Sequence, residues 1–82
     1  MATATNEQIL DVLARIADTE EVRSNPSLAL YELQILDSMK TVELIVALQS
    51  EIGVDISPAE FDRDAWATPA KMVEDVQRRL AA

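Results

Sequence analysis

Residues 37–53, DSMKTVELIVALQSEIG, carry the clearest structural pattern in this chain of 82 residues. They predict a helix from about Ser38 to Ile52, ended by Gly53, because glycine readily takes the left-handed conformation at a helix end. On a helical wheel the apolar residues span too broad an arc for contact with one neighbouring helix. The helix is therefore expected to be central, or to use part of its apolar arc for partners. The polar side holds only Lys40, Glu43, Ala47, Ser50 and Glu51, and the apolar arc holds Met39, Val42, Leu44, Ile45, Val46, Leu48 and Ile52.

The composition of the chain points to helices. Hydrophobic residues make up 49 % of it, with one Gly, one Trp, one Tyr and one Phe. β-rich domains usually have more aromatic residues and more Gly-rich turns. A chain of this length has no material for a second core. We therefore predict an all-α fold that forms a single domain over residues 1–82.

Two further helices are marked by capping sequences. The stretch 5–8, Thr-Asn-Glu-Gln, has the capping-box pattern, so a helix begins there, and its apolar pattern fades at Asp18. Thr68 followed by Pro69 combines a cap residue with a proline at the first helical position and opens a last helix. The apolar positions are Ile9, Val12, Leu13 and Ile16 in the first helix and Met72, Val73, Val76 and Leu80 in the last, where Arg78 and Arg79 lie near the negative helix end.

The connection from Glu20 to Asp37 is long for a compact domain, which suggests a function for it. Its apolar residues are expected to pin it across the helices and so to hold the following serine in place. Further on, the stretch 57–60, Ser-Pro-Ala-Glu, completes a capping box and predicts a short helical turn. The expected anchors of the connection are Leu28, Leu30, Leu33, Ile35 and Leu36.

The net charge of −8 excludes some classes of partner. It repels nucleic-acid phosphates and anionic membrane surfaces, so we expect no nucleic-acid role. The chain has no cysteine and no histidine, so zinc and haem would lack their usual ligands and we predict no metal site. No secretory signal and no apolar run long enough for a membrane span are visible. We expect a cytoplasmic monomer.

Ser38 is the candidate functional residue. Without histidine or cysteine in the chain, a serine that is modified by another enzyme is a simpler interpretation than a serine nucleophile. In the first turn of a helix, free backbone N–H groups and the helix dipole favour an anion such as a phosphodiester. The alternative is that Ser38 or Asp37 only caps the helix.

The order of these elements resembles the acyl and peptidyl carrier proteins. It runs from a helix through a long anchored loop to an Asp-Ser pair before the second helix, then to a short helix and a last one. In that family the serine of Asp-Ser-Leu or Asp-Ser-Met receives 4′-phosphopantetheine. The resemblance implies a bundle of three main helices plus one short helix, with covalent 4′-phosphopantetheine on Ser38.

Within this group the chain is most similar to the D-alanyl carrier proteins of lipoteichoic acid modification. The resemblance implies that the cargo is D-alanine, destined for teichoic acid at the membrane. Two residues depart from the usual pattern, since Gln34 and Lys40 stand where carriers of these kinds have Gly. The matching segments are 36–39 (Leu-Asp-Ser-Met), 41–42 (Thr-Val), 48–49 (Leu-Gln), 53–56 (Gly-Val-Asp-Ile), 60–63 (Glu-Phe-Asp-Arg), 66–69 (Trp-Ala-Thr-Pro) and, upstream, 21–23 with 25–26.

The resemblance also implies the partners. A phosphopantetheinyl transferase modifies the serine, an ATP-dependent adenylating ligase loads the amino acid as a thioester, and an acceptor acyltransferase, which can be membrane-bound, takes it. The carrier itself has no catalytic residues. The alternatives are a carrier for another amino acid or acyl group, or a non-carrier helical interaction module. Partner contacts are expected at Leu36, Asp37, Met39, Lys40, Val42 and Glu43.

Three residues after position 60 have a structural and a functional interpretation. Trp66 and Phe61 are interpreted as packing residues rather than contacts for a partner. Arg63 stands between two aspartates and is interpreted as a local ion-pair residue that holds its loop, with a partner contact as the alternative.

Overall fold

The computed structural model describes residues 4–57 and 62–81, and in these ranges it is all-helical without strands, as predicted. Three helices are long and two are a single turn. The elements are α1 (Asn6–Ala17), α2 (Glu21–Ser24), α3 (Ser38–Glu51), the 3-10 helix η1 (Arg63–Trp66) and α4 (Pro69–Ala81).

Helix α1 begins as its sequence predicts. The Thr5 hydroxyl accepts the Gln8 backbone N–H at 3.1 Å, and the Gln8 side chain accepts the Thr5 backbone N–H at 2.8 Å, which completes the capping box. The helix ends at Asp18, which takes the left-handed conformation with φ 58°. The side chains of Ile9 and Leu13 are fully buried, whereas Ile16 is only partly buried.

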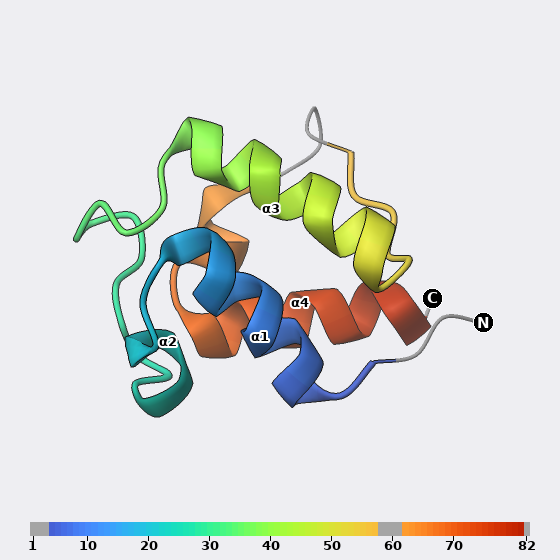
Figure 1. Cartoon of the computed structure of the whole chain (residues 1–82), viewed down its shortest axis with the longest axis horizontal. Coiled ribbons are helices and arrows are strands. Elements are labelled where there is room, and N and C mark those ends of the chain that lie inside the picture. The colour runs from blue at the N-terminus through green and yellow to red at the C-terminus, as the bar shows by residue number, and fades with distance from the viewer. Residues whose placement is uncertain (1–3, 58–61, 82) are drawn as a thin grey trace.

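Helix α1 is the central element of the bundle. It contacts α2, α3 and α4, and Figure 1 shows α3 above it and α4 below α3. The interpretation of α3 as a central helix is therefore wrong, and α3 lies at the surface with one face exposed. The core residues include Ile9, Leu13, Leu30, Leu36, Leu44, Leu48, Trp66, Met72 and Val76.

Helix α3 keeps its predicted bounds to within one residue. It ends at Glu51, with Gly53 in the positive-φ region at 86° and its N–H donated to the Leu48 carbonyl at 3.0 Å. Its inner face holds Leu44, Ile45 and Leu48.

The connection between α1 and α3 is anchored, but differently from the prediction. It contains α2, which the sequence analysis missed because four residues show no helical period. Leu28, Leu30 and Leu36 are buried and Ile35 is partly buried, as expected for anchors. Leu33 is 59 % exposed and is not an anchor.

The region between α3 and α4 is described only in part. The short helical turn predicted from Ser57 onward falls on residues 58–61, which lie outside the described residues, as does Phe61. Trp66 in η1 is fully buried, so its interpretation as a packing residue is confirmed. Its ring N–H donates to Asp75 of α4 at 2.9 Å.

Arg78 and Arg79 pair with Asp75. Its carboxylate, which is only 3 % exposed, accepts hydrogen bonds from Arg78 at 2.5 Å and Arg79 at 2.9 Å. Both arginines lie in the last turn of α4, as expected for cations near the negative end of a helix dipole. The burial of the Asp75 carboxylate was not predicted from the sequence, because aspartates are mostly exposed in folded proteins.

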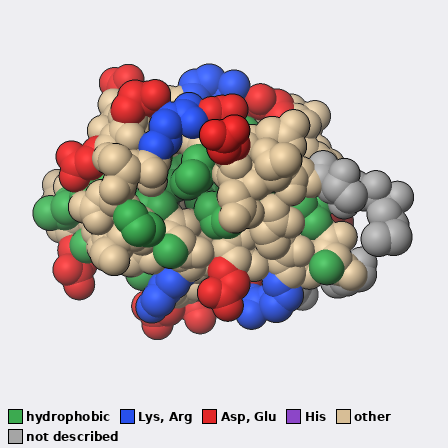
Figure 2. Space-filling view, turned by 90° about the horizontal axis from the view of Figure 1, so that it is seen from below, with side chains coloured by type: hydrophobic (Ala, Val, Ile, Leu, Met, Phe, Trp, Pro, Cys, Tyr) green, Lys and Arg blue, Asp and Glu red, His purple; other side chains and the backbone are tan. Residues whose placement is uncertain are grey.

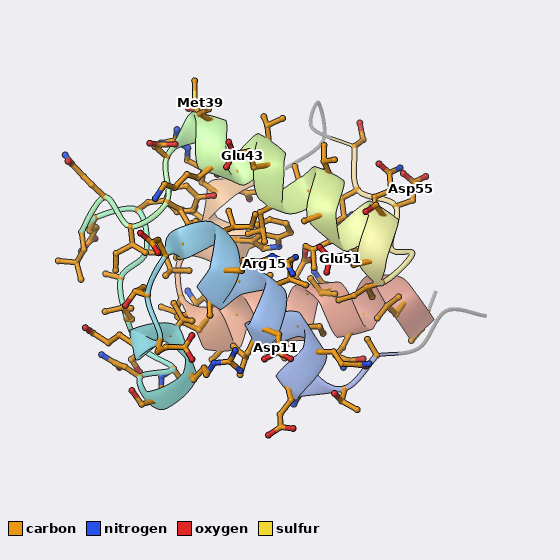
Figure 3. All side chains as sticks on the ribbon, in the orientation of Figure 1. Asp11, Arg15, Met39, Glu43, Glu51 and Asp55 are labelled. Atoms are coloured by element: carbon orange, nitrogen blue, oxygen red, sulfur yellow. The ribbon has the colours of Figure 1, made fainter. Side chains whose placement is uncertain are left out.

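Across the bundle, an ion pair joins α1 to α3. Arg15 and Glu51 point toward each other in Figure 3, and they form a salt bridge between these helices. Within residues 4–57 and 62–81, no helix is both long enough and apolar enough to cross a membrane.

Candidate functional site

Asp37, not Ser38, caps helix α3. Its extended backbone places the carboxylate to accept the Lys40 N–H at 2.8 Å, while its carbonyl accepts the Thr41 N–H at 2.8 Å. Ser38 is therefore the first helical residue and is exposed. Because Asp37 does the capping, the Ser38 hydroxyl remains available for other chemistry.

Arg63 reaches the hydroxyl of Ser38. One of its guanidinium N–H groups donates to Ser38 Oγ at 2.8 Å, across 25 residues of sequence. The neighbouring Asp62 carboxylate instead accepts the Asp64 N–H at 3.0 Å and so caps η1. The structure records no ion pair between Arg63 and either aspartate, all three of which are described, so its interpretation as a local ion-pair residue is wrong.

Tyr31 supports Arg63 from the loop. The guanidinium carbon lies 5.0 Å from the centre of the tyrosine ring, within the range of a cation–π contact. Arg63 therefore bridges the loop before α3 and the first residue of α3. Sequence analysis did not single out Tyr31, although it is the only tyrosine of the chain.

A chain of hydroxyl groups connects Tyr31 to the cap. Thr41, which is buried, donates its hydroxyl to the Asp37 carbonyl at 2.7 Å. Since that hydroxyl has one proton, the 2.7 Å contact between Tyr31 and Thr41 has the tyrosine as donor. Burial raises the pKa of Tyr31, and the positive charge of Arg63 offsets this rise only in part.

The backbone of Leu30 fixes the loop on both sides. Its N–H donates to the Ala67 carbonyl at 3.0 Å, and its carbonyl accepts the N–H groups of Ile35 at 2.8 Å and Leu36 at 3.0 Å. Gln34 lies inside this turn with φ 59°, in the left-handed region. That conformation explains physically why a glycine suits the position.

Two cavities differ in their relation to Ser38. One of about 290 Å³ has Tyr31, Arg63, Ala67 and Thr68 in its wall and so lies beside the site. A larger one of about 410 Å³ lies between α1, α2 and α4 and includes none of the predicted site residues. Figure 2 looks at the molecule from below and shows hydrophobic side chains in the middle of this view with charged groups around them.

The predicted partner residues divide by exposure. Met39 is 74 % and Val42 50 % exposed, and Figure 3 shows Met39 pointing away from the bundle at the start of α3. Val46, which was not predicted, is 57 % exposed and follows at helical spacing. Asp37 and Glu43 are exposed and Lys40 is half-buried. Leu36 is 1 % exposed and belongs to the core, so its side chain does not fit the predicted role of partner contact.

No group of three or more acidic residues in the described ranges is arranged to hold a metal ion. The chemistry of the site is instead that of an exposed hydroxyl beside a guanidinium, at the N-terminus of a helix. A protein-family model described as a phosphopantetheine attachment site matches residues 7–76, which include Ser38 and Arg63.

Proposed function

The chain belongs to the family of phosphopantetheine attachment domains. We propose that it is an aminoacyl carrier whose 4′-phosphopantetheine group, here called the arm, is attached to Ser38. Proteins of this family are carriers that bear 4′-phosphopantetheine covalently, and they are generally not catalytic themselves. Their function implies a phosphopantetheinyl transferase and further enzymes as partners. The choice of Ser38, the cargo and the identity of these enzymes are parts of the proposal.

One observation carries the choice of Ser38. Its hydroxyl is exposed and is not used as a helix cap, because Asp37 has that role. The surroundings fit a phosphodiester, since Arg63 offers a cationic N–H donor at the same oxygen. When attached, 4′-phosphopantetheine supplies a flexible tether with a terminal thiol for a thioester.

In this proposal the residues around Ser38 orient the attachment site and take no part in a chemical step. Asp37 and Thr41 fix the start of α3, so the hydroxyl is presented at a defined place. A tethered thioester reaches a partner's active site at high effective concentration. Each partner must then dissociate, so a small contact surface suits a carrier. We assign that surface to the exposed side chains of Met39, Val42 and Val46, with Asp37, Lys40 and Glu43 around them.

We propose D-alanine as the cargo and teichoic acid as its destination. The support is the resemblance at segments 60–63 and 66–69, which are more specific than the Asp-Ser pair. Within those segments Arg63 contacts Ser38 and Trp66 is the largest buried side chain. The partners of this proposal are an adenylating ligase and an acceptor acyltransferase. A cytoplasmic location and a monomeric state stay predictions.

Intact-mass measurement tests the attachment. Incubation with a promiscuous phosphopantetheinyl transferase and coenzyme A is expected to add one phosphopantetheine to the chain. Ser38→Ala removes the acceptor hydroxyl and is expected to abolish the gain, whereas Ser50→Ala on the exposed side of α3 is expected to retain it. An unchanged gain in Ser38→Ala contradicts the assignment of Ser38.

A panel of ligases tests the cargo. The modified protein is offered to adenylating ligases specific for D-alanine, for other amino acids and for fatty acids, and thioester formation is followed by mass. Loading by the D-alanine ligase supports the proposed cargo. Loading by another amino-acid ligase alone assigns a different aminoacyl cargo, and loading only with a fatty acid refutes the aminoacyl proposal.

A further inference from the structure

A phosphodiester at Ser38 would be stabilised by a positive charge close to it. The chain has a net charge of −8, and the carboxylate that caps α3 belongs to the adjacent Asp37. This carboxylate already accepts the N–H of Lys40, and the Asp37 carbonyl accepts that of Thr41. The helix N-terminus is thus partly satisfied by Asp37, and a side-chain cation beside Ser38 would add to the stabilisation of a phosphodiester there.

Two cations lie near Ser38, and their geometry differs. Lys40 follows Ser38 by two positions on the same helix, and residues so spaced do not face each other. Arg63 arrives from η1 and already donates to Ser38 Oγ at 2.8 Å. A guanidinium also presents several N–H groups in one plane, so it can bind two phosphate oxygens at once.

Arg63 is positioned for this role, and it forms no ion pair with any residue in the described ranges 4–57 and 62–81. Its guanidinium carbon is 5.0 Å from the centre of the Tyr31 ring, while Asp62 is engaged in capping η1. Arg63 also borders the cavity of about 290 Å³ beside the site, so space remains next to the guanidinium.

We propose that Arg63 binds the phosphate of the group attached to Ser38, and that Lys40 does not. This inference rests on the proposed function, because it concerns the state in which Ser38 carries its phosphodiester. The Ser38 Oγ that accepts from Arg63 in the free hydroxyl form becomes the ester oxygen, and the guanidinium then pairs with the phosphate oxygens attached to it. Arg63 therefore anchors the base of the arm on the Tyr31 side of α3, away from the exposed apolar face.

Phosphorus NMR of the modified protein tests the inference. In wild-type protein labelled with ¹⁵N, a hydrogen-bond correlation is expected between the guanidinium of Arg63 and the ³¹P nucleus. Arg63→Gln is expected to lose that correlation, shift the ³¹P resonance and narrow its line, because the phosphate becomes more mobile. Arg63→Lys keeps the charge without the planar donors and is expected to give an intermediate shift.

Two controls separate Arg63 from other cations. Lys40→Gln is expected to leave the ³¹P resonance and the Arg63 correlation unchanged. Arg15→Gln removes an exposed arginine that pairs with Glu51 far along α3, and it is expected to have no effect. A correlation to Lys40 in the wild-type protein, or an unchanged ³¹P resonance in Arg63→Gln, overturns the inference.

Intact mass is recorded for every sample, so the two proposals fail separately. If the wild-type chain gains no mass, the proposed function fails and this inference fails with it. If the wild-type chain gains mass but the ³¹P resonance is the same in Arg63→Gln, the carrier function is retained and only the phosphate-binding role of Arg63 is refuted. Since the wild-type correlation identifies its donor directly, incomplete loading of Arg63→Gln does not prevent a decision.

Discussion

Asp37 and Ser38 are adjacent but have separable roles at the start of α3. The Asp37 carboxylate satisfies a backbone N–H of the first turn, so Asp37→Ala is expected to lower the free energy of unfolding by about 1 kcal/mol. Ser38→Ala removes one exposed hydrogen bond and is expected to change it by less than about 0.5 kcal/mol. Urea denaturation of both variants measures these values, and a cost of Ser38→Ala equal to that of Asp37→Ala contradicts the assignment of the cap.

The hydroxyl of Tyr31 reports on the charge of Arg63. Burial raises its pKa above the ordinary value of 10.0, whereas Arg63 acts in the opposite direction. The pKa of Tyr31 is therefore expected to rise further in Arg63→Gln. Because the folded-state pKa of Tyr31 lies above the unfolded one, folding favours the protonated phenol. The stability that depends on the protonated phenol is complete below about pH 10 and is lost as the pH rises through the folded-state pKa.

Ultraviolet difference absorption measures the titration directly, since Tyr31 is the only tyrosine. Lys40→Gln serves as a control that removes a different positive charge. A lower pKa of Tyr31 in Arg63→Gln than in the wild-type protein contradicts the placement of the guanidinium over the ring.

Gln34 occupies a backbone conformation that glycine adopts without steric cost. With its φ of 59°, a residue that has a Cβ is destabilised by about 1–2 kcal/mol through steric contact with its own backbone. Glycine avoids this steric cost, but it loses more conformational entropy on folding, which offsets part of the gain. Gln34→Gly is therefore expected to raise the free energy of unfolding by up to about 1 kcal/mol, and Gln34→Val to lower it. Urea denaturation checks both, and a stabilising valine contradicts the left-handed conformation.

At the scale of elements, the sequence predicts what depends on neighbouring residues. Thr5 with Gln8, and Gly53 after α3, are local signals, and the corresponding helix ends lie within one residue of their predicted places. Helix α2 has only four residues and no apolar period that marks it. Which of the apolar residues of α3 face outward depends on the packing of α1, which no local pattern contains.

Sequence also predicted the candidate site only in part. Ser38 was predicted as the attachment residue from its place at the helix start and from the resemblance, and its modification stays a prediction. The roles of Arg63 and Tyr31 arise from contacts across 25 residues of sequence and from a ring in another segment. Two flanking aspartates suggested an ion pair for Arg63, but Asp62 caps η1 instead.

The exposed face of α3 is expected to bind the enzymes that act on the carrier. Met39, Val42 and Val46 follow the i, i+3, i+7 spacing, so they line one side of the helix. Replacing Val42 and Val46 together by serine removes apolar contact without adding charge. The double variant is expected to lower kcat/KM of the transferase about tenfold, equivalent to about 1.4 kcal/mol.

The stability of that variant is expected to change by less than about 0.5 kcal/mol, since both valines are largely exposed. Ser50→Ala, outside this apolar line on the same helix, is the matched control and is expected to keep the wild-type kcat/KM. Unchanged kinetics in the double variant contradict the assignment of this face.

At the scale of the whole molecule, polar contacts join separate elements in addition to the packing of the apolar core. Arg15 links α1 to the end of α3, and the Leu30 backbone links the loop to Ala67. Gln77 of α4 donates to the Ala4 carbonyl at 2.8 Å and to the Asn6 side chain at 3.0 Å. Of these contacts, the Leu30 hydrogen bond holds the loop before α3 against the residue that follows η1, and so helps to place Tyr31 and Arg63 beside the start of α3.

Asp75 is the polar centre of this assembly, and acid is expected to weaken it. Burial raises the pKa of Asp75, but hydrogen bonds from Arg79, Trp66 and Arg78 outweigh burial and hold it below its ordinary value of 3.8. Since the folded-state pKa is the lower one, the stabilisation is complete above the unfolded pKa and is lost as the pH falls through the folded-state pKa. Asp75→Asn keeps an acceptor for Trp66 but loses the charge-assisted bonds to both arginines.

The variant is therefore expected to be less stable than wild type by about 2 kcal/mol at pH 7. Because protonation removes the same charge from the wild-type protein, the difference is expected to shrink as the pH falls from 7 to about 2. Urea denaturation followed by the fluorescence of Trp66, the only tryptophan, measures both proteins across this range. Glu74→Gln, at an exposed neighbouring position of α4, is the matched control and is expected to keep the wild-type stability to within about 0.5 kcal/mol at pH 7. The free energies of unfolding of wild type and Asp75→Asn could instead differ by a constant amount down to about pH 2. That result would show that the charge of Asp75, paired with the two arginines, does not stabilise the fold.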